Sequence, residues 1–510
     1  MLARVFSTAL IGIEPYLVEV EVNVEGQAFK YATVGLPELS VRESKERVIA
    51  AIKNTGFRFP PKSYTINLAP ADVKKEGSAF DLPIAVGILA ALGFIMHTDL
   101  EEYVILGELA LDGDLRPIKG ALPSAVGVHA KGKKGMILPA QNAREAAVTG
   151  LVDIIPVTNL HDAILFLNGE KQIAPLKVDT RKLFKRSRKY AVDMADVRGQ
   201  AHVKRALEVA AAGSHNVLMI GPPGSGKTML AKRFPTILPE MTLSEALETT
   251  KIHSIAGMVR QEGLVATRPF RSPHHTISDA ALVGGGRIPR PGEVSLAHHG
   301  VLFLDELPEF QKNVLEVMRQ PLENGEVTIS RASMSLSYPA NFILISAMNP
   351  CPCGYSGDPR HDCSCQPNSI QRYMAKISGP LLDRIDLHIE VPAIPFDDLA
   401  AHADGEFSKL IRQRTQSARD IQIERFSDFS EIHSNADMPP KLIREICTIN
   451  GQSSKLLKTA IESLGLSARA YDRILKVSRT IADLERSEAI LEEHIAEAIQ
   501  YRTLDRQLWL

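Results

Sequence analysis

The residues best suited to chemistry form a glycine-rich segment, Gly221–Thr228. It reads Gly-Pro-Pro-Gly-Ser-Gly-Lys-Thr, follows the apolar run Val217–Ile220 and precedes the helix-forming run Met229–Lys232. A strand, a glycine-rich turn and a helix are the surroundings that a phosphate-binding loop needs, because backbone N–H groups then converge on an anion. A chance match to the pattern is the alternative, and the flanking elements argue against it.

Two residues of this segment carry the predicted contacts to a bound nucleotide. Lys227 should reach the β- and γ-phosphates, and Thr228 should hold Mg²⁺. The predicted nucleotide-binding residues of the segment are Gly221, Pro222, Pro223, Gly224, Ser225, Gly226, Lys227 and Thr228.

A second apolar run ends in two carboxylates. Val301–Leu304 is followed directly by Asp305 and Glu306, as expected for a buried parallel strand that ends at the carboxyl edge of its sheet. Asp305 would orient Mg²⁺ through its water ligands, and Glu306 would polarise the water that attacks the γ-phosphate. Solvated acids at the tip of a strand are the alternative. Downstream of a phosphate-binding loop, the pair predicts a P-loop ATPase that uses ATP and Mg²⁺.

Four of the five cysteines, Cys351, Cys353, Cys363 and Cys365, lie within fifteen residues of one another. Two Cys-x-Cys pairs around a polar loop suit a tetrahedral zinc–thiolate site, and four protein ligands would make that site structural. His361 could replace one ligand, and four free thiols in a reducing cell are the alternative. This local cluster does not resemble a disulfide framework.

Composition limits the classes of partner and the compartment. The 510 residues carry a net charge of −1, so any surface that binds nucleic acid must be a local basic patch. Only 5% of the residues are aromatic, which argues against base stacking as the main mode of binding. Six of the nine residues Arg181–Lys189 are basic, which fits either a phosphate contact or a solvated linker. The N-terminus does not read as a signal peptide and Leu82–Met96 is too short to span a bilayer, so we expect a cytoplasmic protein without a membrane segment.

Residues 1–170 are expected to form a small α/β domain. Val18–Val24 alternates with polar residues as a half-buried strand does, Glu25-Gly26 turns the chain, and Phe29–Val34 returns it. The motifs at residues 75–85 and 113–120 resemble the Lon protease-type domain, which has a ribosomal S5 domain 2-like fold. Ile84 stands where active Lon enzymes have the serine and Leu122 where they have the lysine, which excludes serine–lysine peptidase chemistry. The resemblance therefore implies a scaffold or binding domain.

Residues 191–395 resemble an AAA+ module. The segment Asp196-Val-Arg-Gly-Gln200 is similar to the one that packs near adenine, and Asn349, at the end of the apolar run Phe342–Ile345, matches sensor 1. Arg384, in Gly379–Leu387, resembles the arginine finger of the magnesium chelatase and MCM helicase branch, which serves ATP on a neighbouring subunit. The alternative interpretation of Arg384 is a surface ion pair with Asp383 or Asp386. In the helical residues 396–510, Arg469 resembles the lid's sensor 2, and Arg473 lies one turn further on.

Two insertions support the same branch. Phe270–Gly286 resembles a helix-2 insertion that faces a ring's pore, and Val327–Ser330 with Leu336–Tyr338 predicts a hairpin before sensor 1. Such hairpins touch nucleic acid in related motors, so the candidate DNA contacts are Arg287, Arg290 and Arg331. Solvated surface arginines are the alternative.

The order of these parts resembles the YifB/ComM family of magnesium chelatase-like ATPases. The chain comprises a Lon-like domain (1–170), a basic linker (171–190), an AAA+ core with a four-cysteine insertion (191–395) and a helical lid (396–510). The motif Asn349–Tyr355 is highly specific to this family. The resemblance implies a homo-oligomeric, hexameric DNA motor of the helicase or branch-migration type that acts in recombination during natural transformation. A protein remodeller and a metal-insertion motor stay open as other functions.

Overall fold

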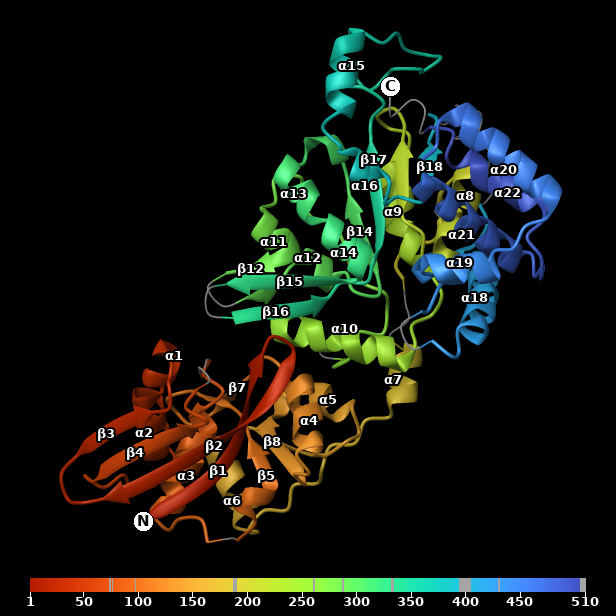
Figure 1. The fold of residues 1–510 in the computed structure, drawn as a ribbon. Coiled ribbons are helices and arrows are strands. Elements are labelled where there is room, and N and C mark those ends of the chain that lie inside the picture. The colour runs from red at the N-terminus through yellow and green to blue at the C-terminus, as the bar shows by residue number, and fades with distance from the viewer. Residues whose placement is uncertain are drawn as a thin grey trace. The chain divides into compact units, whose positions relative to one another are not determined.

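The computed structural model describes residues 1–72, 75, 77–96, 98–186, 190–259, 262–286, 289–331, 334–393, 405–429 and 432–504. The chain divides into two compact units (Figure 1). The N-terminal unit comprises Met1–Arg188 together with Leu243–Ala266, and the second unit comprises Lys189–Thr242 and Thr267–Leu510. Each unit is described by itself below.

A seven-stranded mixed sheet forms the centre of the N-terminal unit. Its strand order is β3-β4-β2-β1-β5-β8-β9. The strands are β1 (Leu2–Ile11), β2 (Glu14–Glu25), β3 (Lys30–Val34), β4 (Ser63–Ala69), β5 (Tyr103–Ile105), β8 (Gly135–Pro139) and β9 (Asp153–Val157). Val18, Val20, Val22 and Val24 of β2 are buried, which confirms the half-buried strand. The returning strand β3 lies at the edge of the sheet and pairs in parallel with β4.

Helices cover this sheet and bury its apolar residues. The main ones are α2 (Ser44–Asn54), α3 (Asp81–Ala91), α4 (Ala121–Ala130), α5 (Ala140–Ala147) and α6 (Leu160–Leu167). Helix α3 packs on β1 and β2, and nearly all its side chains are buried. Ile84 in α3 and Leu122 in α4 are both fully buried, so the positions that would hold a serine and a lysine in a Lon enzyme serve as core.

One helix of the N-terminal unit comes from far along the chain. Helix α10 (Leu243–Ala256) follows the glycine-rich segment and its helix in sequence, yet it packs against α4. The amide of Gly120 donates to the carbonyl of Ser254 over 3.3 Å, and the hydroxyl of Ser254 donates to the buried carboxyl of Glu145. Burial raises the pKa of Glu145. The expected domain limits had placed this segment in the AAA+ core.

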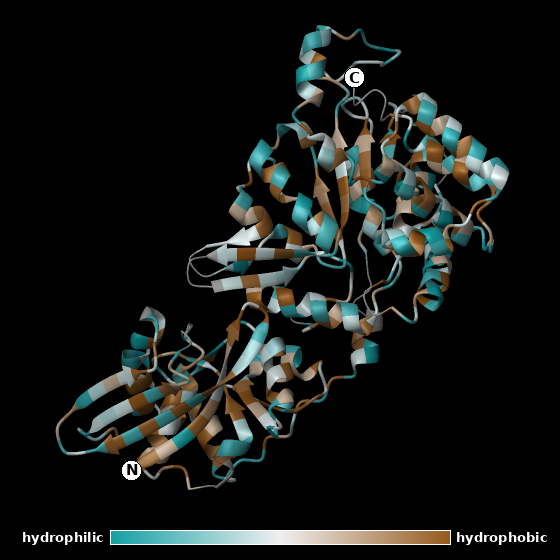
Figure 2. Cartoon of the chain, in the orientation of Figure 1, coloured by the Kyte–Doolittle hydropathy of each residue, from teal (hydrophilic) through white to brown (hydrophobic). Residues whose placement is uncertain are grey.

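The second unit contains a five-stranded parallel sheet with the order β11-β14-β17-β10-β18. The strands are β10 (Val217–Ile220), β11 (Phe270–Arg271), β14 (Val301–Leu304), β17 (Ile343–Met348) and β18 (Leu387–Glu390). Its inner strands are buried throughout. All their residues except Ser346 are apolar, as the largely brown strands in Figure 2 show. A parallel sheet of this kind needs helices on both faces, and Figure 1 shows them there.

Short helices and a hairpin surround this sheet. The helices are α8 (Ala201–Gly213), α9 (Lys227–Arg233), α11 (Asp279–Val283), α12 (Glu293–Leu296), α13 (Lys312–Val317), α14 (Arg319–Asn324), α15 (Pro367–Met374) and α16 (Gly379–Leu382). Strands β15 (Glu326–Arg331) and β16 (Met334–Pro339) pair in antiparallel register, which confirms the predicted hairpin. Strands β12 (Gly284–Gly285) and β13 (Arg290–Pro291) form a second, shorter pair.

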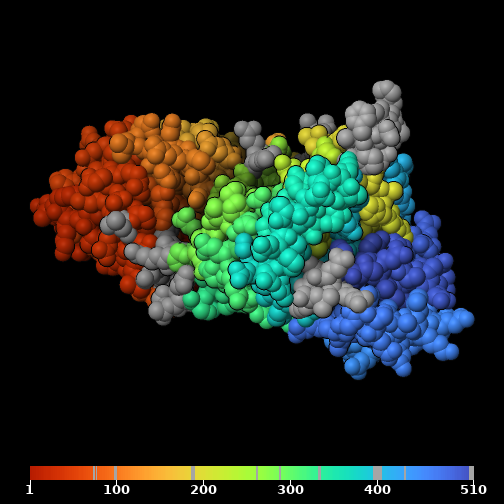
Figure 3. Space-filling view, turned by 90° about the horizontal axis from the view of Figure 1, so that it is seen from above, coloured from red at the N-terminus to blue at the C-terminus, as the bar shows by residue number. Residues whose placement is uncertain are grey.

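The C-terminal region is helical, as predicted, and gathers at one end of the second unit (blue in Figure 3). Its helices are α18 (Ser408–Arg425), α19 (Pro440–Ile446), α20 (Gly451–Leu464), α21 (Ala468–Leu484) and α22 (Glu492–Gln500). Helices α18 and α21 pack against α8, and apolar residues of both join the core around β10. No helix in the described part of the chain is both long and apolar enough to cross a bilayer.

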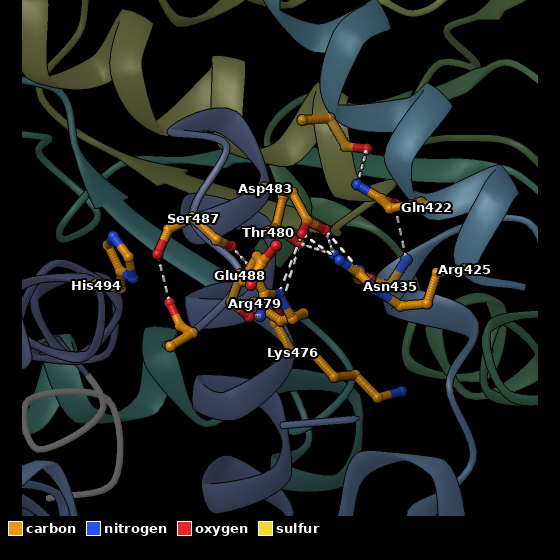
Figure 4. Close-up of polar contacts among 12 residues, drawn as sticks. Gln422, Arg425, Asn435, Lys476, Arg479, Thr480, Asp483, Ser487, Glu488 and His494 are labelled. Atoms are coloured by element: carbon orange, nitrogen blue, oxygen red, sulfur yellow. Dashed lines mark hydrogen bonds and ion pairs between the residues drawn. The ribbon is translucent and has the colours of Figure 1, made fainter. Parts of the chain in front are cut away.

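A buried carboxylate links the C-terminal helices to one another (Figure 4). Asp483 of α21 is 1% exposed and accepts hydrogen bonds from Arg425 of α18 (2.8 Å), Arg479 (3.1 Å) and Asn435 (2.8 Å). A buried charge is tolerated only when it is paired and hydrogen-bonded. The network therefore joins α18 to α21 through one buried, fully paired carboxylate.

Candidate nucleotide-binding site

The glycine-rich segment forms a loop at the carboxyl end of the central strand β10. Gly224 (φ 76°) and Gly226 (φ 88°) adopt left-handed conformations that favour glycine. A Cβ atom on Gly221 would lie 2.1 Å from the carbonyl oxygen of Val391, so the close approach of the chain after β18 requires glycine there. Helix α9 begins at Lys227. Strand, loop and helix follow in the predicted order.

The amine of Lys227 is folded back over this loop and is 8% exposed. It donates to the carbonyls of Gly221 (2.6 Å) and Pro222 (2.9 Å) and to the hydroxyl of Ser225 (3.3 Å). It also donates to Oδ1 of Asn349, at the end of β17, over 3.3 Å. Burial lowers the pKa of Lys227 to about 8, partly offset by the charge of Asp305. The carbonyl oxygens of Gly221 and Pro222 are among the amine's present acceptors. Phosphate oxygens of a bound nucleotide would replace them.

Thr228 and Asp305 meet at the same edge of the sheet. The hydroxyl of Thr228 donates to Oδ2 of Asp305 over 2.7 Å, and the other carboxylate oxygen accepts from the amide of Glu306 (3.0 Å). A hydroxyl and one carboxylate are the oxygen ligands that suit Mg²⁺, which is held by one or two carboxylates together with the phosphates of a substrate. The residues present therefore fit the metal that the sequence predicts.

Glu306 has an unusual backbone and an exposed side chain. Its φ of 54° is left-handed, which costs a residue other than glycine about 1–3 kcal/mol. The side chain is 59% exposed, and Oε2 lies 3.4 Å from Nδ1 of His275. His275 belongs to the predicted helix-2 insertion, and nothing in the sequence around it indicates a contact with Glu306. The side chain of Glu306 therefore reaches solvent, whereas that of Asp305 is held by Thr228.

A segment before α8 closes the other side of the loop. The side-chain amide of Gln200 donates to the carbonyls of Ser225 (2.8 Å) and Pro392 (3.2 Å). The segment Asp196–Gln200, expected near adenine, therefore contacts the glycine-rich loop through its last residue. A cavity of about 1060 Å³ opens beside the loop and is lined in part by Gly221, Pro222, Pro350, Gln371, Met374 and Pro392.

Arg384 and Arg469 contact a different group of residues. Arg384 is 8% exposed, donates to the carbonyl of Pro380 (2.7 Å) and pairs with Glu323, rather than with Asp383 or Asp386 as the ion-pair alternative had it. Nη1 of Arg469 lies 3.8 Å from Asp383, and its side chain is 61% exposed. Among the described residues neither arginine contacts the glycine-rich loop.

Arg473, one turn after Arg469, pairs with a different acid of the finger segment. Its partner Asp386 is 2% exposed and also accepts from the amide of Asn216 over 2.9 Å. Burial alone would raise the pKa of Asp386, but the charge of Arg473 together with the neighbouring His215 and the hydrogen bond from Asn216 outweighs it and holds this pKa well below its usual range. Arg473 thus anchors α21 to the finger segment, which leaves Arg469 as the more exposed of the two arginines.

The four cysteines converge beside the loop. Their ligand atoms all lie within 4.8 Å of one another, with Sγ separations of 3.3 Å (Cys351–Cys353), 3.7 Å (Cys351–Cys363) and 3.6 Å (Cys353–Cys363). Four thiolates about 2.3 Å from one zinc ion stand roughly 3.8 Å apart in a tetrahedron, so the cluster fits Zn²⁺. His361 lies outside it, with Nδ1 3.8 Å from Asp358.

The cysteine segment also touches the nucleotide loop. Gly354 lies so close to Pro223 that a Cβ atom there would be 2.6 Å from Cδ of the proline. Cys351 is fully buried and follows Asn349 by two residues. The cluster is therefore built into the wall of the nucleotide site.

The proposed DNA contacts are only partly within the described residues. Arg290 is exposed in β13, whereas Arg287 and the side chain of Arg331 lie outside the described residues. In the basic linker, Thr180–Arg186 forms helix α7, and residues 187–189 are not described.

Comparison with known proteins agrees with this geometry. Residues 193–399 match the family model described as magnesium chelatase, subunit ChlI, residues 20–142 match subunit ChlI of Mg-chelatase, and residues 405–502 match the ChlI C-terminal model. The Magnesium-chelatase 67 kDa subunit of Chlorobaculum tepidum is 26% identical over 296 residues, or 57% of this chain and 40% of its own.

Two full-length relatives are more similar. The Competence protein ComM of Haemophilus influenzae is 46% identical over 510 residues, which cover 99% of this chain and 98% of its own. The protein YifB of Escherichia coli is 42% identical over the same length and the same shares. The P-loop, the acidic pair and the parallel sheet are those of an AAA+ ATPase, and the chain belongs to the ComM/YifB family of magnesium chelatase-like proteins.

Proposed function

We propose that the chain is a Mg²⁺-dependent ATPase that assembles into a ring, a hexamer in the simplest case, and drives DNA through it in the cytoplasm. One observation carries the ATPase part of the proposal. Lys227, Thr228, Asp305 and Asn349 are joined by hydrogen bonds at the carboxyl edge of one parallel sheet. Phosphoryl transfer is catalysed chiefly by positioning and charge stabilisation, and this group supplies a cation, two Mg²⁺-binding oxygens and an amide.

The residues would divide the work as follows. Lys227 exchanges its carbonyl partners for the β- and γ-phosphate oxygens, while Thr228 and Asp305 hold Mg²⁺, which neutralises charge that develops on the phosphates. Glu306, exposed and turned out by its backbone, accepts the proton of the attacking water. Asn349 stays beside Lys227 and orients that water. Arg384 serves the nucleotide of a neighbouring subunit. Arg469 contacts a γ-phosphate and couples its presence to the angle of the helical lid.

The DNA part of the proposal rests on the relatives and on surface arginines. A full-length relative is named Competence protein ComM, and uptake of DNA is the process that competence denotes. Within the described residues, Arg290 at the short β12–β13 pair is exposed and offers a phosphate contact. The Lon-like N-terminal unit, which would lack the catalytic serine and lysine, would act as a scaffold. Branch migration in recombination is the specific activity proposed.

The test is the ATPase rate with and without single-stranded and forked DNA at several salt concentrations. Stimulation by DNA that fades as salt rises indicates contact with the phosphate backbone, because neutralised phosphates release counterions. Normal basal hydrolysis with no response to any DNA would contradict the motor and favour a remodeller of proteins, to be tested with unfolded protein. A metal-insertion role would instead require porphyrin and partner subunits.

A further inference from the structure

The finger residue Arg384 is covered by an acid of its own chain. Nη2 of Arg384 pairs with Oε2 of Glu323, which lies in the last turn of α14. The side chain of Arg384 is only 9% exposed, whereas that of Glu323 is 58% exposed. Nε of Arg384 is buried without a hydrogen-bond partner among the described residues. The guanidinium is thus oriented from within the fold, and Glu323 covers its outward side.

Two further arginines lie around the same carboxylate. Arg319 begins α14, one turn before Glu323, and Arg469 lies in the first turn of α21. Together with the hydrogen bond from Arg384, their charges hold the pKa of Glu323 below its usual range. Each has another partner: Arg319 donates to Glu316 over 2.6 Å, and Arg469 lies 3.8 Å from Asp383. Arg384 therefore pairs directly with this exposed carboxylate, and Arg319 and Arg469 act on it through their charges.

This arrangement resembles an anion site that is already filled. The Glu323 side of this pair is exposed, so solvent screens the attraction and a more highly charged anion can displace the carboxylate. A phosphate oxygen group carries more charge than a carboxylate and offers three acceptors to planar guanidinium groups. A terminal phosphate that reaches this surface would outcompete Glu323 for the same donors.

We propose that Arg319, Arg384 and Arg469 form a docking site for the terminal phosphate of ATP bound to a second copy of the chain, and that Glu323 occupies this site in the single subunit. The inference rests on the ring ATPase proposed above. It adds Arg319 as a third arginine of the site and makes Glu323 a built-in competitor. Glu323 lowers the activity of subunits that are not yet correctly paired, because the neighbour's phosphate must first displace it.

The fold explains how displacement would be transmitted. Glu323 is separated from β15 (Glu326–Arg331) only by Asn324 and Gly325, and Gly325 has a left-handed φ of 67°. The finger segment is tied to α21 through the pair of Asp386 and Arg473. When Glu323 leaves Arg384, the start of β15, which follows Glu323 closely, is free to shift. Arg384 itself keeps its place, because the pair of Asp386 and Arg473 ties its segment to α21.

The test compares basal ATPase rates of wild type and Glu323→Gln, without DNA, over a range of protein concentrations. Loss of the competitor should lower the protein concentration for half-maximal activity about two- to five-fold, the factor that corresponds to the weak ion pair. Glu406→Gln is the matched control, because Glu406 forms an exposed ion pair with Arg414 over 2.5 Å in the same unit. The control should behave as wild type.

A mixing experiment tests the cluster independently. Arg319→Gln alone should hydrolyse ATP slowly, and mixing it with Lys227→Ala should restore activity, because each partner then supplies what the other lacks. A Glu323→Gln curve equal to wild type, or an Arg319→Gln defect that mixing does not rescue, would overturn the inference. A wild-type ATPase that DNA fails to stimulate would contradict the DNA motor alone, since neither comparison uses DNA.

Discussion

Lys227 and Asn349 share a hydrogen bond of 3.3 Å although 122 residues separate them in the chain. Lys227 follows the central strand β10, and Asn349 follows its neighbour β17, which pairs with β10 in parallel. Parallel strands end at the same edge of a sheet, so the two side chains must meet there. The amide that is proposed to read the γ-phosphate therefore touches the amine that is proposed to bind it.

Replacing Lys227 by alanine should abolish nucleotide binding, because the amine is the one cation hydrogen-bonded within the described glycine-rich loop. A fluorescence titration with a labelled nucleotide measures this. Lys232→Ala is the control, since Lys232 is exposed on the same helix. Binding by Lys227→Ala at wild-type affinity would contradict the site.

Glu306→Gln should bind ATP normally and hydrolyse it about 100-fold more slowly or worse, because glutamine cannot accept the proton of the attacking water. Bound nucleotide and single-turnover rate are the two measurements. Glu309→Gln removes a nearby exposed acid that pairs with Lys376 over 3.3 Å, and it should keep its turnover. Near-wild-type turnover in Glu306→Gln would reject the assigned role.

Nucleotide affinity should weaken above about pH 8, because burial lowers the pKa of Lys227 to about 8 in the free protein. Phosphate binding requires the protonated amine, so each pH unit beyond the pKa reduces affinity roughly tenfold. Lys227→Arg should flatten this profile, since arginine stays charged. A wild-type affinity that is constant from pH 7 to about 9.5 would speak against a depressed pKa.

The same shift has the opposite effect on stability. The folded chain binds fewer protons at Lys227 than the unfolded chain between the folded value of about 8 and the ordinary value of 10.5. This group alone therefore raises the free energy of unfolding as pH increases through that window. Lys227→Ala removes the contribution, and urea unfolding of both chains without nucleotide at pH 8 and 10 measures the difference.

The cysteine cluster should hold one zinc ion per chain, and Cys351→Ser should lose it. Because Gly354 packs against Pro223 of the nucleotide loop, loss of zinc should also lower nucleotide affinity and the melting temperature. Metal analysis by mass spectrometry and a thermal melt measure both. His361→Ala is the control, as His361 lies outside the cluster. If the chain without metal binds nucleotide with unchanged affinity, the cysteine cluster does not support the nucleotide loop.

Much of the nucleotide site could be predicted from the sequence because its residues follow apolar strands. Strands β10, β14 and β17 end at one edge, which brings Thr228 to Asp305 and Lys227 to Asn349. The β15–β16 hairpin follows from the two stretches Val327–Ser330 and Leu336–Tyr338, in which apolar and polar residues alternate, on either side of a turn. In these places local pattern and tertiary contact agree.

The contacts that sequence reasoning missed join segments without a shared pattern. Nothing in the sequence around Glu323 or His275 indicates that they would pair with Arg384 and Glu306. The parallel pairing of β3 with β4 likewise depends on how the sheet assembles, since a turn at Gly26 fits a return on either side. Such partners are set by side-chain geometry across the fold rather than by spacing along the chain.

Helix α10 makes the two units inseparable by simple truncation. The backbone passes between them three times, at residues 188–189, 242–243 and 266–267. A fragment that ends near residue 170 would leave Glu145 and Gly120 without Ser254. A fragment that starts near residue 190 would carry α10 without α4, the helix on which it packs. Any division of this chain into separately produced fragments must therefore keep α10 with the N-terminal unit.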